Sequence, residues 1–214
     1  MTDLLKIKKI DKSDKRVQYL IRKDKVLGKK KKKKNEIEYF LSNNFNQFFV
    51  YTIIGQLIST KVANKIYAKF AKLCNNDLSA DSILKFSPDD LRALGMTYKK
   101  ADYILSFMQI LKNNKNYLSD INEMDDENAM KELTKLRGIG KWTAKMILMF
   151  CLDRQDIVPV EDLAFVKGYN HLYKCNKKPA QILKDCKKWS PYGSVASRYI
   201  YEHGDEIFGN IPKL

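Results

Sequence analysis

The sequence predicts an all-α protein, and three observations lead to this fold class. From Glu36 onward, apolar residues recur at spacings of three and four, which is the period of an α-helix. Helix-capping residues stand at segment ends, as in SPDDLRALG, where Ser87 and Pro88 can begin a helix and Gly95 can end it. No alternating strand pattern of comparable strength is present. With 44% apolar residues among 214, the chain can bury a core and is expected to form one domain or two small lobes.

Residues 1–36 are predicted to form a short N-terminal segment that precedes a helical unit of residues 37–214. Within this segment, VQYLIRKDKVLG (residues 17–28) predicts a short amphipathic helix. The unbroken like charges of Lys29–Lys34 repel one another and are expected to form a solvated, mobile loop. A contact between this loop and phosphate groups is the alternative.

The helical unit divides into segments at capping and turn residues. NEIEYFLSNNFNQFFVYTIIGQLIS predicts two helices separated by Ser42–Asn44, and STKVANKIYAKFAKLC predicts an amphipathic helix with one apolar stripe. That stripe contains Val62, Ile66, Phe70 and Leu73. Further helices, giving about ten in all, are expected in residues 79–87, 87–95, 97–114, 127–136, 142–152, 163–173, 179–189 and 194–204.

The composition indicates an anionic partner and excludes several classes of protein. A formal net charge of +15 favours nucleic acid, although a lysine- and asparagine-rich composition can also reflect an AT-rich genome. No run reaches the roughly 18 apolar residues of a membrane helix and no secretory signal is present, so a cytoplasmic or nuclear protein without membrane contact is expected. The cysteines and histidines are scattered, so neither a tight metal site nor an iron–sulfur cluster is expected. These residues are Cys74, Cys151, Cys175, Cys186, His171 and His203.

The motif LRGIGKWTAK (residues 136–145) leaves only the four residues RGIG between two predicted helices. Such a connection predicts a tight helical hairpin in which Gly138 and Gly140 can take positive φ. The open N–H groups and the dipole at the start of the second helix favour a phosphate, with Lys141 and Lys145 beside them. The alternative is an ordinary capping glycine followed by a turn.

The segment LRGIGKWTAKMILMF resembles the helix-hairpin-helix of the HhH-GPD DNA glycosylase superfamily. FFVYTIIGQLISTKVANKI is similar to the segment that supplies that family's DNA-wedging residue, and VPVEDLAFVKG to the loop that carries its aspartate. SPDDLRALGMTYKKADYI and WSPYGSVASRYIY are similar to two further helical segments. The resemblance covers residues 37–203 and implies two helical lobes with a cleft between them, with the hairpin at residues 127–152.

Within the superfamily, the chain is most similar to the 3-methyladenine DNA glycosylase II group. Trp142 stands where bifunctional relatives of the endonuclease III type have a lysine nucleophile, and their C-terminal cysteine cluster is absent. The resemblance implies a monofunctional DNA N-glycosylase that excises alkylated purines, such as 3-methyladenine and 7-methylguanine, during base excision repair. A bifunctional glycosylase/lyase and a non-catalytic helix-hairpin-helix damage sensor are the alternatives. The larger N-terminal lobe of the bacterial relative would be shortened or rebuilt here.

The resemblance also assigns roles to single residues. Asp162, after Pro159, would stabilise the cationic sugar while water attacks C1′, and Glu161 is the alternative if the alignment shifts by one. Leu57 would fill the gap left by the flipped base, and Gln56 would bind the orphaned partner base. The alternative for Leu57 is a place in the core.

Aromatic faces attract a cationic alkylated base, so Trp142 and Tyr192 would line the base pocket, with core packing as their alternative. Met146 would join them, where the best-known bacterial relative has an aromatic residue. The hairpin would bind DNA phosphates, without sequence preference, through Gly138, Gly140, Lys141 and Thr143. A loosely bound monovalent cation on the hairpin carbonyls is the only cofactor implied. The expected partner is double-stranded DNA with damaged bases, bound by a monomer.

Overall fold

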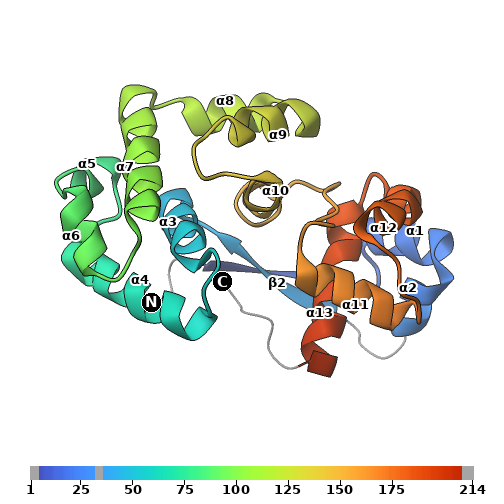
Figure 1. Cartoon of the computed structure of the whole chain (residues 1–214). Helices are drawn as coiled ribbons and strands as arrows, with labels where there is room; N and C mark the ends of the chain where they lie inside the picture. Colours follow the sequence, from blue (N-terminus) through green and yellow to red (C-terminus); the bar gives the residue numbers. More distant parts are fainter. Residues whose placement is uncertain (1–4, 32–35, 209–214) are drawn as a thin grey trace. The chain divides into compact units, whose positions relative to one another are not determined.

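The computed structural model describes residues 5–31 and 36–208, which form two compact units (Figure 1). The terminal unit contains residues 5–31, 36–43 and 145–208, and the central unit contains residues 44–144. Both units are mostly α-helical, which confirms the predicted fold class. Residues 5–31 share a unit with residues 145–208, so the units differ from the division expected at residue 36.

The terminal unit contains a two-stranded antiparallel sheet that the sequence analysis did not predict. Its strands are β1 (Leu5–Asp11) and β2 (Glu36–Ser42). The prediction of a helix directly after Glu36 was therefore wrong. Every second residue of β2 is buried, namely Ile37, Tyr39 and Leu41, which is the period of a strand. Over so short a stretch the apolar residues fit both periods, and pairing with β1 decides between them.

The remaining elements of the terminal unit are helices. They are α1 (Lys15–Lys23), α2 (Lys25–Lys31), α11 (Leu163–Leu172), α12 (Pro179–Cys186), the 3-10 helix η1 (Lys187–Trp189) and α13 (Gly193–Phe208). The amphipathic helix expected at residues 17–28 is present as α1 and α2, which are separated at Asp24. The loop expected at Lys29–Lys34 was wrong for Lys29–Lys31, which belong to α2. Lys32–Lys34 lie outside the described residues.

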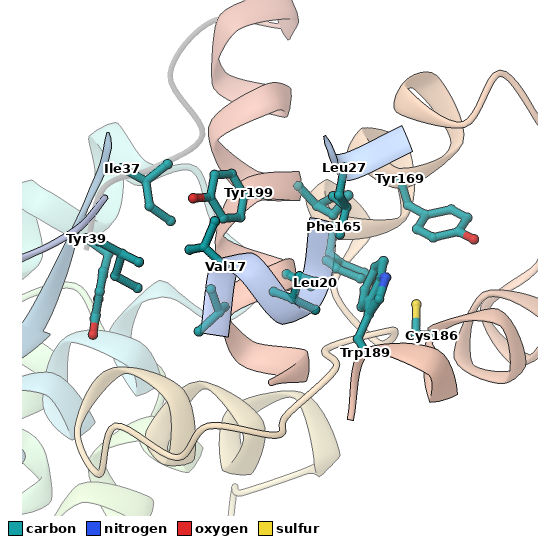
Figure 2. Close-up of a cluster of buried hydrophobic side chains, with 14 of the residues drawn as sticks. Val17, Leu20, Leu27, Ile37, Tyr39, Phe165, Tyr169, Cys186, Trp189 and Tyr199 are labelled. Carbon is teal, nitrogen blue, oxygen red and sulfur yellow. The ribbon is translucent and has the colours of Figure 1, made fainter. Parts of the chain in front are cut away.

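The N-terminal helices complete the core of the terminal unit (Figure 2). Val17 and Leu20 of α1 and Leu27 of α2 belong to one cluster of buried side chains with Phe165 of α11 and Trp189 of η1. Removing these side chains from water is the main favourable contribution to folding of this unit. The helix that the predicted catalytic residue caps therefore packs in a core that residues 5–31 help to form.

Within the terminal unit, the buried carboxylate of Asp24 joins the N-terminal helices to residues 173–189. Asp24 Oδ2 accepts hydrogen bonds from Tyr173 Oη at 2.6 Å and Trp189 Nε1 at 2.9 Å, and it pairs with Lys188 Nζ at 2.9 Å. Burial by itself disfavours the charged form, but the bonds from Tyr173, Trp189 and Lys188 outweigh it and hold the pKa of Asp24 below its usual range. The carboxylate is therefore stable in the core because all its donors are present.

The central unit is a run of short helices joined by tight turns. They are α3 (Phe45–Gly55), α4 (Thr60–Leu73), α5 (Ala80–Ile83), α6 (Pro88–Ala93), α7 (Tyr98–Asn113), α8 (Tyr117–Glu123) and α9 (Asp126–Thr134). Helix α10 (Lys141–Phe150) begins in this unit and continues into the terminal unit. None of the helices described in either unit is long and apolar enough to cross a membrane.

The helix caps and the apolar stripe predicted for the central unit are mostly confirmed. Ser87 and Asp90 form a capping box at the start of α6, and Gly95 follows its end with φ of +107°. The expected stripe of α4 was wrong at Val62, which is 44% exposed. Ala63 is buried in its place. Because Ala63 and Ile66 are three residues apart, they lie on one face of the helix.

Candidate functional site

The glycine hairpin lies in the central unit, where six residues, Lys135–Gly140, connect α9 to α10. Gly138 has φ of +81°, as predicted, and a Cβ atom there would lie 2.2 Å from Cδ2 of Tyr103. Gly138 must therefore be glycine for both conformation and space. The prediction of positive φ was wrong for Gly140, and a Cβ atom there would meet nothing within 4 Å. Gly140 instead leaves open space at the N-terminus of α10.

Leu57 is fully exposed (104%) and has φ of +60°. It lies in the four-residue turn, Gln56–Ser59, between α3 and α4. A left-handed backbone costs a non-glycine residue about 1–2 kcal/mol, and an exposed leucine contributes no burial to offset it. The core alternative for Leu57 is thereby excluded. An apolar side chain held outward at the expense of backbone strain is a candidate for contact with a ligand.

Gln56 connects this turn to the glycine hairpin. Its Nε2 donates hydrogen bonds to the carbonyl oxygen of Gly138 at 3.0 Å and to Thr143 Oγ1 at 3.4 Å. The central unit thus brings together Leu57, Gln56 and the hairpin. The expected contact between Gln56 and an orphaned base stays a prediction.

Residues 140–143, at the start of α10, differ in their exposure to solvent. Gly140 and Lys141 are exposed and Trp142 is half-buried, whereas Thr143 is only 2% exposed. Among the four residues predicted to bind phosphate, Thr143 is therefore the least accessible. Gly140 and Lys141 have the exposure, main-chain N–H groups and positive charge that suit an anion at a helix N-terminus.

Asp162 lies in the terminal unit and is the N-cap of α11. Its Oδ1 accepts hydrogen bonds from the main-chain N–H groups of Ala164 at 2.7 Å and Phe165 at 3.1 Å. Two donors fix the carboxylate in one orientation. The buried hydroxyl of Tyr201 on α13 lies near it, and burial together with the negative charge of Asp162 raises the pKa of Tyr201 well above its usual range. The sequence carries no local signal for this neighbour, which is 39 residues away along the chain.

The loop before Asp162 is held by the start of α13. The N–H of Ile157 donates to Ser194 Oγ at 2.9 Å, and the N–H of Gly193 donates to Asp156 Oδ1 at 2.9 Å. A Cβ atom on Gly193 would lie 2.8 Å from that same Oδ1, so a larger residue there would displace the carboxylate of Asp156. Glu161, the alternative catalytic acid, forms an ion pair of 2.7 Å with Lys145. The two adjacent carboxylates therefore have different partners.

The remaining predicted pocket residues in the terminal unit are Tyr192 and Met146. Tyr192 is partly buried and meets Tyr19 of α1 edge to face, with ring centroids 5.3 Å apart. Tyr19 also donates from Oη to the carbonyl oxygen of Ser190 at 2.5 Å. Tyr19 was not predictable from the sequence, because its partners lie about 170 residues away along the chain. Met146 is 3% exposed, so little of its side chain is accessible.

A metal site in a protein needs several His, Cys, Asp or Glu side chains close together. In the part of the chain that the structure describes, no group of three His, Cys, Asp or Glu residues is arranged to hold a metal ion. The four cysteines are free thiols, and burial raises the pKa of Cys74 to about 11. A thiol with a raised pKa is a poor nucleophile at neutral pH.

The chain is similar to several known proteins. The Bacillus subtilis protein YfjP is 34% identical over 123 residues, which cover 56% of this chain and 43% of YfjP. DNA-3-methyladenine glycosylase 1 of Schizosaccharomyces pombe is 27% identical over 155 residues, which cover 70% of this chain and 68% of that protein. The chain thus spans less than half of YfjP and about two thirds of the yeast relative.

A similar fold is present in a solved structure. The crystal structure of a DNA-3-methyladenine glycosidase from Bacillus halodurans matches with a TM-score of 0.84 at 24% identity, covering 92% of each chain.

A family model also matches the chain. It is described as HhH-GPD superfamily base excision DNA repair protein, and it matches residues 50–191. This match includes the turn of Leu57, the glycine hairpin and Asp162. The chain belongs to the HhH-GPD superfamily of base excision DNA repair proteins.

Proposed function

We propose that this protein is a monofunctional DNA N-glycosylase that excises alkylated purines from duplex DNA. Leu57 is the observation that carries the proposal, because its exposure and strained backbone suit insertion into a base stack. Family membership and the names of the yeast and Bacillus halodurans relatives support the reaction and the class of substrate.

Duplex binding and base flipping are assigned to the central unit. The exposed Gly140 and Lys141 would bind a phosphate at the N-terminus of α10. Leu57 would enter the space left by the flipped nucleotide, so that the stacked duplex does not close again. Since Gln56 joins the turn to the hairpin, the phosphate contact and the wedge act from one hydrogen-bonded structure.

Recognition of the damaged base is assigned to the aromatic side chains of Trp142 and Tyr192, together with Met146. A purine methylated at N3 or N7 carries a positive charge, and aromatic faces attract cations by roughly 1–2 kcal/mol each when water is excluded. Normal purines are neutral and lack this attraction. These side chains would therefore favour an alkylated base without reading a particular substituent.

Cleavage is assigned to Asp162. As the N-glycosidic bond breaks, its electron pair leaves with the purine, which departs uncharged, and C1′ becomes cationic. The fixed carboxylate of Asp162 would stabilise that cation, and water would then add at C1′ and lose a proton. The product is an abasic site. No covalent intermediate with the protein is needed, because Trp142 replaces the lysine of the bifunctional relatives.

A monovalent cation at the hairpin is part of the proposal. The carbonyl oxygens of Leu136, Gly138 and Gly140 each accept one hydrogen bond, and each carbonyl has a second lone pair. Uncharged oxygen donors suit a weakly held monovalent ion. Such an ion would add positive charge near the bound phosphate.

The test is base release from alkylated duplex DNA, with the products identified by chromatography. Asp162→Asn keeps a good helix-capping residue, so α11 should remain folded while base release falls about 100-fold or more. Glu161→Gln is the matched control and should retain most of the activity. A folded Asp162→Asn protein with full activity would refute the role of this residue.

The same samples separate the two alternative functions. A bifunctional enzyme would be trapped on DNA by borohydride, whereas the proposed enzyme would not. A non-catalytic damage sensor would bind alkylated duplex DNA without releasing a base, and its binding would be unaffected by Asp162→Asn.

A further inference from the structure

Lys100 holds the turn that presents Leu57. This lysine is the third residue of α7, and its Nζ donates to the carbonyl oxygens of Ile54 at 2.7 Å and Gln56 at 2.6 Å. The carbonyls at the end of a helix lack partners within the helix, so Lys100 caps the C-terminus of α3. Its second acceptor belongs to the residue directly before Leu57. The ammonium group therefore fixes the main chain at the position where the backbone turns left-handed.

Lys145 makes an equivalent contact in the terminal unit. Its Nζ donates to the carbonyl oxygen of Val158 at 2.8 Å and to Glu161 Oε2 at 2.7 Å. Its side chain is 15% exposed. Val158 and Glu161 belong to the loop that ends at Asp162, so this lysine holds the main chain that leads into the proposed catalytic residue.

The two lysines end similar stretches of sequence. LRALGMTYKK (residues 91–100) and LRGIGKWTAK (residues 136–145) share Leu-Arg, a hydrophobic residue before glycine, and lysine five positions after that glycine. The turns themselves differ, because the second helix begins at Tyr98 in one stretch and at Lys141 in the other. In both stretches the lysine still lies within the first two turns of that helix.

We infer that Lys100 and Lys145 are positioning residues, which orient Leu57 and Asp162 by binding the main chain beside them. This inference rests on the proposed function for the roles of Leu57 and Asp162. In a protein with a net charge of +15, the simpler expectation for any lysine is a contact with a DNA phosphate. Each of these ammonium groups already has two protein acceptors within 2.8 Å, which favours the internal role.

The two lysines should affect different steps of the reaction. Leu57 matters while the base is leaving the stack, so loss of Lys100 should impair flipping. Flipping is easiest for a base that is poorly paired, and the effect should shrink for a lesion opposite a mismatched base. Asp162 matters after flipping, so loss of Lys145 should slow cleavage equally for paired and mismatched lesions.

The experiment compares Lys100→Met and Lys145→Met with the matched controls Lys99→Met and Lys167→Met. Lys99 and Lys167 are exposed lysines on α7 and α11, so these controls remove the same charge. Lys100→Met should lower base release from a paired lesion roughly 10- to 100-fold, because misplacing a group by about 1 Å can cost that much. Lys145→Met should cause a similar loss for both pairings, and the two controls should retain the wild-type rate.

Two further measurements distinguish positioning from phosphate binding. The salt dependence of DNA affinity should keep its slope in both variants, whereas loss of a phosphate contact would reduce the slope by about 1. Amide hydrogen exchange should become faster at residues 55–59 in Lys100→Met and at residues 157–162 in Lys145→Met. A reduced salt slope with unchanged exchange in these segments would overturn the inference.

Failure of the proposed function gives a different result. If Leu57→Ala and Asp162→Asn leave base release intact while exchange still becomes faster in the lysine variants, the lysines hold their loops but the assigned roles of the two loops are wrong. If Lys100→Met unfolds, Lys100→Arg keeps a cationic donor and should restore folding and base release. A folded Lys100→Arg protein whose residues 55–59 exchange at the wild-type rate but whose activity stays low would also overturn the inference.

Discussion

Replacing Gly138 with alanine should destabilise the glycine hairpin strongly, for two separable reasons. The backbone at Gly138 has φ of +81°, a conformation that costs an alanine about 1–2 kcal/mol. A Cβ atom would also lie 2.2 Å from Cδ2, 2.5 Å from Cγ and 2.7 Å from Cε2 of Tyr103, so the ring has to move. Overpacking of this kind typically costs about 1–3 kcal/mol.

These contributions are partly offset in the unfolded chain. Alanine has less conformational freedom than glycine when unfolded, which favours folding by about 0.4–1 kcal/mol. The net expectation for Gly138→Ala is therefore a loss of about 1–4 kcal/mol in the free energy of unfolding. For a chain of this size each kcal/mol corresponds to about 2–4 °C, so Tm should fall by about 2–16 °C.

The assay is thermal unfolding followed by circular dichroism, with Gly140→Ala as the matched control. Gly140 has no positive φ and open space around its Cα, so the control should lose no more than about 1 kcal/mol, from the poorer helix cap. Tyr103→Ala separates the two causes, because Gly138→Ala made in that background should lose only the conformational part. Equal Tm values for Gly138→Ala and Gly140→Ala would refute the reasoning.

Three other substitutions test the packing and the wedge. Asp24→Asn should destabilise the protein by about 1–3 kcal/mol, because an amide cannot accept all the hydrogen bonds that the buried carboxylate accepts from Tyr173 and Trp189. The folded pKa of Asp24 is lower than its unfolded pKa, so the stability that the carboxylate contributes is complete above the unfolded value of about 4. This contribution is lost as pH falls through the folded pKa. The difference in Tm between the wild type and Asp24→Asn should therefore shrink below about pH 4. Gly168→Ala should lower the free energy of unfolding by about 1–3 kcal/mol, because its Cβ would lie 2.9 Å from the carbonyl oxygen of Ile200; an unchanged urea midpoint would contradict this. Leu57→Gly should leave Tm unchanged or raise it slightly while base release from duplex DNA falls, and a loss of Tm would instead mean that Leu57 supports the fold.

Helices and their ends were predictable because their causes are local. The capping box of Ser87 and Asp90 and the positive φ of Gly138 depend on a few adjacent residues. The family was predictable for the same reason, since its hairpin motif is a contiguous stretch that retains its spacing. Asp162 could be placed at the start of a helix, because an aspartate after a loop is a common N-cap.

The sheet and the neighbours of the site were not predictable, because they depend on pairs of residues far apart in the sequence. β2 is a strand only because β1 lies beside it, and its own pattern also suited a helix. Tyr19 reaches Tyr192 across more than 170 residues, and neither tyrosine has a local pattern that indicates the other.

The sequence by itself determined most of the helices after residue 44, many of their ends, and the superfamily to which the chain belongs, because periodicity, caps and motif spacing act over a few residues. Only the tertiary structure decided that Leu57 is exposed with a left-handed backbone and that Lys100 and Lys145 bind main-chain carbonyls. A lysine looks alike in sequence whether its ammonium faces a phosphate, water or a carbonyl oxygen. The acceptor is fixed by how distant segments pack, and that packing is absent from any local pattern.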